Sequence, residues 1–181
     1  MSDGRFDVII QGAGMVGLLL ARALAPLGLK IALLDAKPVQ RWQGGEWQLR
    51  VIAVSTATER ILRRLGVWES MARVSPFRAV QAWDAVGRGS VLFDSADIGE
   101  PHLGHIVENG LIQTVLYDRL LQDGGLPVSI PAAIETVQAD AERVAVTLAD
   151  GRRLEARLLV GADGANSRVR ALCGIEVDQR G

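Results

Sequence analysis

The amino-acid sequence predicts an α/β protein that begins with a parallel βαβ unit and continues with antiparallel hairpins. A short apolar strand at residues 6–11, a glycine-rich turn, a helix at 15–27 and a second strand at 30–35 follow one another within about 30 residues. Crossovers of this kind are almost always right-handed, so the two strands are expected to be parallel. Short alternating segments at 80–93 and 143–160, each interrupted by turn-forming glycines, predict the hairpins.

The remaining segments predict two more helices and one long loop. Residues 36–49 are polar and rich in glycine, which is typical of an exposed loop. Apolar residues at helical spacing predict a helix at 55–65 that stops at Gly66, and a further helix at 111–121. Pro26 lies in the last predicted turn of the first helix and can end that helix early.

Composition excludes several classes of function. The chain has 181 residues, of which 49% are hydrophobic and 23% charged, and its net charge of -1 gives no reason to expect nucleic acid. One cysteine and two histidines exclude a disulfide framework, a cysteine-based zinc site and a histidine-rich metal site. The lack of disulfides and of any run of about 18 apolar residues predicts a cytoplasmic protein that can still touch a membrane surface.

The strongest motif lies between the first predicted strand and the first predicted helix. It consists of Gly12, Ala13, Gly14, Met15, Val16 and Gly17. In a GxGxxG segment the first glycine permits a tight turn, the second lets the backbone approach a pyrophosphate, and the third lets helix and strand pack closely. Asp35, at the end of the second strand, can accept hydrogen bonds from a ribose and disfavours a 2′-phosphate. The motif predicts dinucleotide binding, without separating FAD from NAD; the alternative is a glycine-rich turn with no ligand.

A second motif follows the apolar strand that ends at Val160. The segment GADGANSRVR (161–170) places the carboxylate of Asp163 between two glycines at a strand end, where it can reach a ligand. The alternative is an ordinary strand-to-helix turn in which Asp163 only caps the helix. Ser167 can also cap that helix.

A third candidate is Arg50, in the segment LRVIAVS between the polar loop and the next helix. A guanidinium group near a pyrophosphate presents a planar fork to anionic oxygens. On the residues alone, an ordinary surface arginine is the favoured interpretation.

The motifs GAGMVG and GADGANSRVR, together with HLGHIVEN at 102–109, resemble flavoprotein monooxygenases of the para-hydroxybenzoate hydroxylase fold. More narrowly they resemble the bacterial ubiquinone-biosynthesis hydroxylases, along essentially the whole chain. The resemblance implies a Rossmann-like FAD-binding domain of the GR2 type with part of an antiparallel substrate-domain sheet. It also implies that a β segment at about 76–108, inserted in this domain, belongs to the substrate lobe.

The resemblance assigns cofactor roles to named residues. The glycine motif and Asp35 would hold the ADP half of FAD, Arg50 and Asn109 would lie near the cofactor, and Asp163 would serve both FAD and the nicotinamide nucleotide. The full set of expected cofactor-binding residues is Gly12, Ala13, Gly14, Met15, Val16, Gly17, Asp35, Ala36, Arg50, Asn109 and Asp163. No catalytic side chain and no metal ligand is expected, and His105 is interpreted as structural.

The implied activity is that of an FAD-dependent aromatic hydroxylase that uses NADPH or NADH and O2. Its substrate would be a polyprenylated phenol or quinol of ubiquinone biosynthesis, which requires docking at the inner membrane or association with a biosynthetic complex. Three alternatives stay open: a fragment that binds FAD without activity, another oxidoreductase of the same fold such as a halogenase or reductase, and an NAD-dependent dehydrogenase.

Two further expectations concern the whole chain. A later Gly-Asp motif of the family lies outside the 181 residues, so the chain is expected to be truncated, with the C-terminal half of the family fold absent. The glycine turn and the turn that carries Asp163 are expected to converge on one nucleotide from opposite ends of the same sheet.

Overall fold

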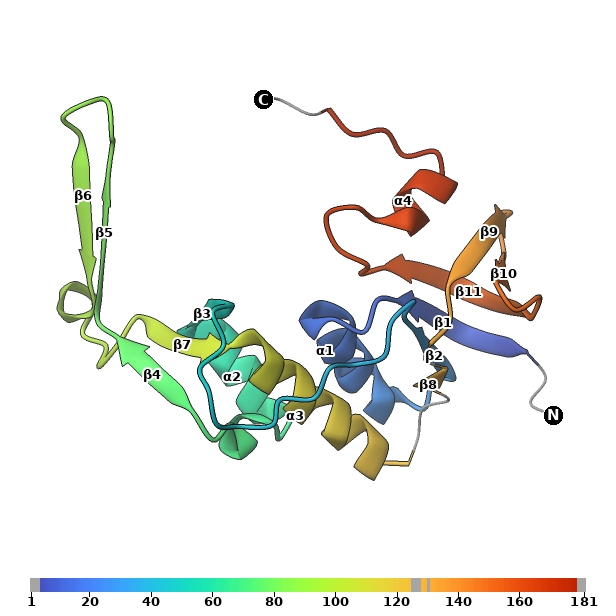
Figure 1. Ribbon diagram of the computed structural model, residues 1–181, viewed down its shortest axis with the longest axis horizontal. Coiled ribbons are helices and arrows are strands. Elements are labelled where there is room, and N and C mark those ends of the chain that lie inside the picture. The colour runs from blue at the N-terminus through green and yellow to red at the C-terminus, as the bar shows by residue number, and fades with distance from the viewer. Residues whose placement is uncertain (1–3, 125–127, 130, 179–181) are drawn as a thin grey trace. The chain divides into compact units, whose positions relative to one another are not determined.

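The computed structural model describes residues 4–124, 128–129 and 131–178 (Figure 1). The chain divides into two compact units. The first unit comprises Met1–Gln40 and Leu116–Gly181, and the second comprises Arg41–Val115. The assignment of residues 76–108 to a substrate lobe stays a prediction.

The first unit is built on a sheet whose described strands lie in the order β8-β2-β1-β11-β10-β9. The pairs β8–β2, β2–β1 and β1–β11 are parallel. The pairs β11–β10 and β10–β9 are antiparallel. The elements are β1 (Arg5–Gln11), α1 (Met15–Leu24), β2 (Ile31–Leu34), β8 (Val128–Ser129), β9 (Ile134–Ala139), β10 (Val144–Leu148), β11 (Arg153–Gly161) and α4 (Arg168–Leu172).

The predicted βαβ unit is confirmed, with one correction at the end of its helix. The helix was expected over residues 15–27, but α1 ends at Leu24 and a 3-10 turn covers Ala25–Leu27. Pro26 has no N–H to donate and so cannot continue the α-helical pattern. The turn closes at Gly28, whose φ of +71° favours glycine.

The core of the first unit lies against the central strands. All four residues of β2 are buried, as expected for a parallel strand covered on both faces. Ile9, Leu34, Val146 and Leu148 belong to one buried cluster that also includes Val169 of α4. Strands β1 and β11, which lead into the two turns that follow them, therefore both contribute residues to this core.

The hairpin expected at 143–160 is confirmed as β10 and β11, which pair with Val144 opposite Ala156. Strand β11 also pairs with β1 on its other side, so it joins the antiparallel and parallel halves of the sheet. Strand β9 was not predicted, and its residues are mostly exposed.

The second unit contains a β3-β7-β4 antiparallel sheet and a separate β5-β6 hairpin, and the hairpin expected at 80–93 is confirmed. The predicted helix start at Ser55 is also confirmed, because its side chain accepts a hydrogen bond from the Thr58 N–H. Its elements are β3 (Val51–Ser55), α2 (Thr56–Arg64), β4 (Val74–Phe77), β5 (Ala79–Trp83), β6 (Ser90–Asp94) and β7 (Gly104–Glu108). Helix α3 (Asn109–Gln122) begins in this unit, and its residues from Leu116 onward belong to the first. Within the described ranges, every helix is too short or too polar to cross a membrane.

Candidate nucleotide-binding site

At two positions of the glycine turn, Gly12 and Gly17, close backbone contacts leave no room for a side chain. Gly12 has a φ of +112°, and a Cβ added to it would lie 2.3 Å from the carbonyl oxygen of Ala162. A Cβ on Gly17 would lie 1.8 Å from the carbonyl oxygen of Gly12. Around Gly14 the described residues leave open space within 4 Å of an added Cβ. Gly12 and Gly17 thus serve the turn and the helix packing that the motif predicts, and Gly14 leaves open the space where the motif predicts a ligand.

The turn that carries Asp163 lies beside the glycine turn, so the expected proximity of the two turns is confirmed, while their sharing of one nucleotide stays a prediction. The expected direction is wrong. Strands β1 and β11 are parallel neighbours with Gln11 opposite Gly161, so both turns leave the same carboxyl edge of the sheet, not opposite ends. Ligands of open α/β sheets bind at this edge, because it gathers the loops that follow several parallel strands.

A cavity of about 460 Å³ lies between these turns. Its walls come from the ends of β1, β2 and β11 and from the start of β9. The lining residues are Gln11, Gly12, Gly14, Asp35, Ala36, Lys37, Ala133, Ile134, Ala162, Asp163, Gly164, Asn166, Arg168 and Val169. The expected residues Gly12, Gly14, Asp35, Ala36 and Asp163 therefore share one cavity.

Helix α1 presents its amino terminus at this turn. Gly14 is the N-cap residue, and among the described residues no side chain caps the helix and no acid occupies its first turn. The free N–H groups and the partial positive charge of the helix end favour an anion. Met15 is half-buried and Val16 is exposed in this first turn, whereas Ala13 and Gly17 are buried.

Besides the ribose contact expected of it, Asp35 accepts two hydrogen bonds from the protein backbone. Its Oδ2 accepts a hydrogen bond from the Ala13 N–H at 2.7 Å, and its Oδ1 accepts one from the Lys37 N–H at 2.9 Å. The carboxylate therefore ties the glycine turn to the end of β2. Because each carboxylate oxygen has two acceptor positions, both oxygens retain capacity for ribose hydroxyls.

The contacts of Asp163 are those of a helix cap. Its Oδ1 accepts the Ser167 hydroxyl at 2.5 Å, and its Oδ2 accepts the N–H groups of Arg168 at 2.7 Å and Val169 at 3.2 Å. Ser167 caps α4 as well, because its Oγ accepts the Arg170 N–H at 3.0 Å. Burial raises the pKa of Asp163, but the Ser167 hydroxyl and the backbone N–H donors outweigh it and hold the pKa below its ordinary value.

Replacing Asp163 with alanine is expected to lower the free energy of unfolding by about 1–2 kcal/mol at neutral pH, because the N–H groups that it caps lose their acceptor. A depressed pKa stabilises the fold above the unfolded-state pKa, and this contribution is lost as the pH falls through the folded-state pKa. The difference between wild type and variant, measured by urea unfolding, should therefore shrink from about pH 7 to about pH 3. Asp163→Asn, which keeps one acceptor oxygen, should cost less; an equal difference at both pH values would contradict this account.

Gln11 is a site residue that sequence reasoning missed. It is the last residue of β1, is only 6% exposed and lines the cavity, yet its Oε1 has no hydrogen-bond partner in the described part of the chain. A buried carbonyl oxygen without a donor is costly, so it favours a ligand that donates an N–H or O–H. The signal available in the sequence was a polar residue at the end of an otherwise apolar strand.

Arg50 and Asn109 lie in the second unit, where the structure brings them together. Arg50 directly precedes β3 and Asn109 directly follows Glu108, at the paired ends of β3 and β7. The Asn109 N–H donates to the carbonyl oxygen of Arg50 at 3.0 Å, and Gln48 accepts from the neighbouring Gly110 N–H at 3.1 Å. Arg50 itself is exposed.

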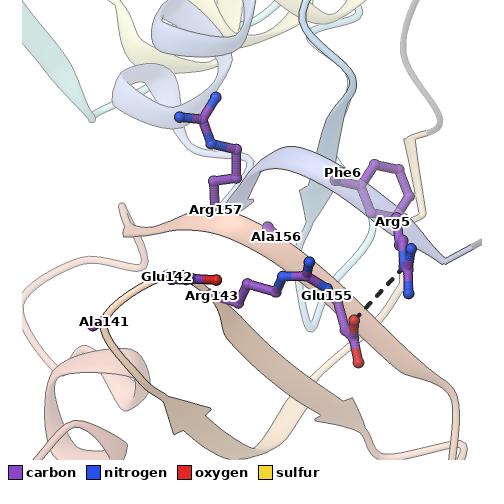
Figure 2. Close-up of a pocket in the computed structure, with 8 residues that line it drawn as sticks. All are labelled: Arg5, Phe6, Ala141, Glu142, Arg143, Glu155, Ala156 and Arg157. Carbon is purple, nitrogen blue, oxygen red and sulfur yellow. Dashed lines mark ion pairs between the residues drawn. The ribbon is translucent and has the colours of Figure 1, made fainter.

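A larger cavity of about 510 Å³ lies elsewhere in the first unit and contains no expected site residue (Figure 2). Arg5 and Glu155, which are opposite each other on β1 and β11, form an ion pair in its wall at 3.9 Å, and Arg157 points away from that pair (Figure 2). Arg5 is largely exposed, so the pair adds little stability. Size alone does not make this cavity the candidate site.

The strand, glycine turn and helix, with an acid at the end of the next strand, define a dinucleotide-binding α/β protein. Residues 5–181 match the family described as FAD binding domain. The chain therefore belongs to the FAD-binding domain family, and the predicted fold class is confirmed.

The predicted resemblance to ubiquinone-biosynthesis hydroxylases is also confirmed. The chain is 32% identical over 180 residues to 3-demethoxyubiquinol 3-hydroxylase of Escherichia coli (strain K12), covering 98% of this chain and 46% of that protein. It is 34% identical over 183 residues to ubiquinone hydroxylase UbiL of Rhodospirillum rubrum, covering 97% of this chain and 41% of that protein. The chain thus spans less than half the length of either relative.

Solved structures agree on the fold. The crystal structure of PqsL from P. aeruginosa in complex with 2-aminobenzoylacetate superposes with a TM-score of 0.76 at 23% identity, covering 98% of this chain and 48% of that one. The flavin-dependent monooxygenase PieE, in complex with FAD and substrate, gives a TM-score of 0.75 at 23% identity, covering 99% and 34%.

Proposed function

We propose that this chain binds the ADP part of FAD and serves an FAD-dependent aromatic hydroxylase that uses NADPH or NADH and O2. The observation that supports the proposal is the single cavity shared by the glycine turn, Asp35 and the Asp163 turn in a member of the FAD-binding domain family. Bound FAD would supply the redox chemistry, and the protein supplies binding, orientation and exclusion of water.

The residues around the cavity fit the ADP group. The open space at Gly14 and the uncapped end of α1 suit a pyrophosphate, and Asp35 has acceptor capacity for ribose hydroxyls. The unpartnered Oε1 of Gln11 would accept a hydrogen bond from the ligand. Because the Asp163 carboxylate is engaged with α4, its role in the proposal is to hold the shape of its turn.

The proposed roles of Arg50 and Asn109 near the cofactor rest on the family resemblance. The proposed substrate is a polyprenylated phenol or quinol, a class suggested by the names of the ubiquinone hydroxylases that the chain resembles. Such a substrate resides in the lipid phase, so the proposal includes a cytoplasmic protein that docks at the inner membrane or joins a biosynthetic complex.

Replacing Asp35 with asparagine is expected to weaken FAD binding about tenfold or more, because charged acceptors contribute more than neutral ones. The measurement is a titration of flavin fluorescence with the full chain. Asp140→Asn is the matched control, since Asp140 also accepts backbone N–H groups, from Glu142 and Arg143, but lies outside the cavity. Equal weakening by both substitutions would contradict the assigned site.

The activity is tested by NADPH and NADH oxidation with a polyprenylated phenol present, and by mass spectrometry of the product. A product that has gained one oxygen atom supports the hydroxylase. FAD binding without NAD(P)H oxidation would overturn the hydroxylase proposal for this chain and support the binding-fragment alternative.

A further inference from the structure

Three side chains in the second unit form a cluster outside the nucleotide cavity. Glu59 lies in α2, His102 lies two residues before β7, and His105 lies in β7. Each offers one ligand atom, and these atoms all lie within 4.8 Å of one another. Glu59 is only 8% exposed and His105 only 9%, so the cluster is largely withdrawn from water.

Both imidazoles face the same carboxylate oxygen. His105 Nδ1 lies 3.1 Å from Glu59 Oε2, and His102 Nε2 lies 3.3 Å from it. Although it is close, His105 Nδ1 is not aligned for a hydrogen bond, and among the described residues it has no hydrogen-bond partner. A buried ring nitrogen without a partner is costly, and this one points into the cluster.

These separations suit an ion between the three atoms. Zinc binds imidazole nitrogen and carboxylate oxygen at about 2.0–2.2 Å, which in a tetrahedral site places neighbouring ligand atoms about 3.3 Å apart. The two nitrogen-to-oxygen distances already match that value. The two imidazole nitrogens lie within 4.8 Å of each other.

The other oxygen of Glu59 is held by Arg63. Its Nε lies 3.0 Å from Glu59 Oε1 and donates a hydrogen bond to it, which leaves Oε2 for the histidines. The carboxylate of Glu59 is therefore held between the Arg63 guanidinium on one side and the two imidazoles on the other. Arg63 also pairs with Glu69 at 2.6 Å, which offsets its repulsion of a cation.

The ring contacts fix the imidazole of His105. Trp68 lies edge-on to it, with ring centroids 5.1 Å apart, and His102 lies edge-on at 4.4 Å. Metal ligands depend on such outer contacts for their orientation, and the Arg63 contact serves Glu59 in the same way.

We propose that Glu59, His102 and His105 bind one divalent transition-metal ion of the zinc class. Two imidazoles and one carboxylate suit such ions, whereas Mg²⁺ and Ca²⁺ prefer oxygen ligands alone. The ion would link α2 to β7 and keep a fourth position for water. Two histidines are too few for a histidine-rich metal site. A mixed site that includes Glu59 is not visible in the sequence, because Glu59 lies 43 residues from His102. The proposal does not depend on FAD binding.

The test uses metal-free full chain titrated with Co²⁺ and then with Zn²⁺. All four tryptophans lie in the second unit, and Trp68 contacts His105, so Co²⁺ should quench their fluorescence and give a visible absorption band. A Cys173→Ser background removes the exposed thiol as a competing ligand. We expect one Co²⁺ per chain, displaced by Zn²⁺.

His102→Gln is expected to weaken Co²⁺ binding about tenfold or more, because it removes a direct ligand. Glu100→Gln is the matched control: it removes an exposed carboxylate of the same unit that pairs with Arg60 and not with the three cluster residues, and should leave the affinity within about threefold. Equal affinity in wild type and His102→Gln, or binding that requires Cys173, would overturn the proposal. If His102→Gln fails to fold, X-ray absorption of the Co²⁺-loaded wild type decides, since fewer than two imidazole ligands would also overturn it.

Discussion

Replacing Gly12 with alanine is expected to remove FAD binding and to lower the free energy of unfolding of the first unit by about 3 kcal/mol. Two effects add at this position. The φ of +112° is one that a residue with a Cβ rarely adopts, and the new Cβ would lie 2.3 Å from the Ala162 carbonyl oxygen and 2.8 Å from the Asp163 nitrogen. Since both contacts are with backbone, relief requires the two turns to separate. That movement opens the cavity between them.

The matched control is Gly14→Ala. Gly14 has a φ of -70°, and the described residues leave space for a Cβ there, so folding should change by less than about 1 kcal/mol. FAD binding should still weaken, because the methyl group would occupy the space in which the pyrophosphate is expected. Urea unfolding followed by far-ultraviolet circular dichroism, with flavin fluorescence for binding, separates the two outcomes. Equal loss of stability in both variants would contradict the assigned contacts.

The sequence predicted those parts of the fold that local rules determine. The βαβ unit and the two hairpins have strong apolar periodicity and clear turn residues. Strands β3 and β4 were not predicted because their sequences, VIAVS and VSPF, lack a regular alternation of apolar and polar residues. Most residues of both strands are exposed. The early end of α1 was signalled by Pro26, but the shift from α-helix to 3-10 turn depends on local geometry that a sequence pattern does not specify.

The candidate site was predicted only where its residues are close in sequence or belong to a motif. Gly12, Gly14 and Asp35 follow from the glycine motif and the next strand. The parallel pairing of β11 with β1 joins segments far apart in the sequence, and no local pattern encodes it. Because this pairing was not predicted, Asp163 was expected at the wrong edge of the sheet. The same reason hid the contact of Glu59 with His102 and His105, which come from separate elements.

Glu108 forms a buried charge pair with Arg73, and its replacement by alanine is expected to lower the free energy of unfolding by about 3–5 kcal/mol. Glu108 is only 2% exposed. Its Oε1 accepts the Gln48 N–H at 2.8 Å and an Arg73 N–H at 3.2 Å. Arg73 Nε lies 3.0 Å from Oε2 but is not aligned for a hydrogen bond, so that contact is electrostatic.

The Glu108 substitution should also destabilise the loop that precedes β3, because Arg73 contacts that loop. The Arg73 guanidinium lies 4.8 Å from the ring centroid of Trp42 and 4.3 Å from that of Trp47, and it donates to the Gly45 carbonyl oxygen at 3.2 Å. Without Glu108, a partly buried cation is left among these groups. Tryptophan fluorescence during urea unfolding reports on this unit alone, because it holds all four tryptophans.

Two comparisons make the Glu108 prediction specific. Glu100→Ala breaks the exposed pair with Arg60, whose charged groups lie 3.5 Å apart, and should cost less than about 1 kcal/mol. The double variant Arg73→Met with Glu108→Met removes both charges and should cost less than the sum of the single substitutions, because no uncompensated charge remains. If Glu108→Ala cost no more than Glu100→Ala, the pair would not be buried in solution. The loop containing Trp42 and Trp47, and the adjoining backbone of Arg50 and Asn109, would then need another support.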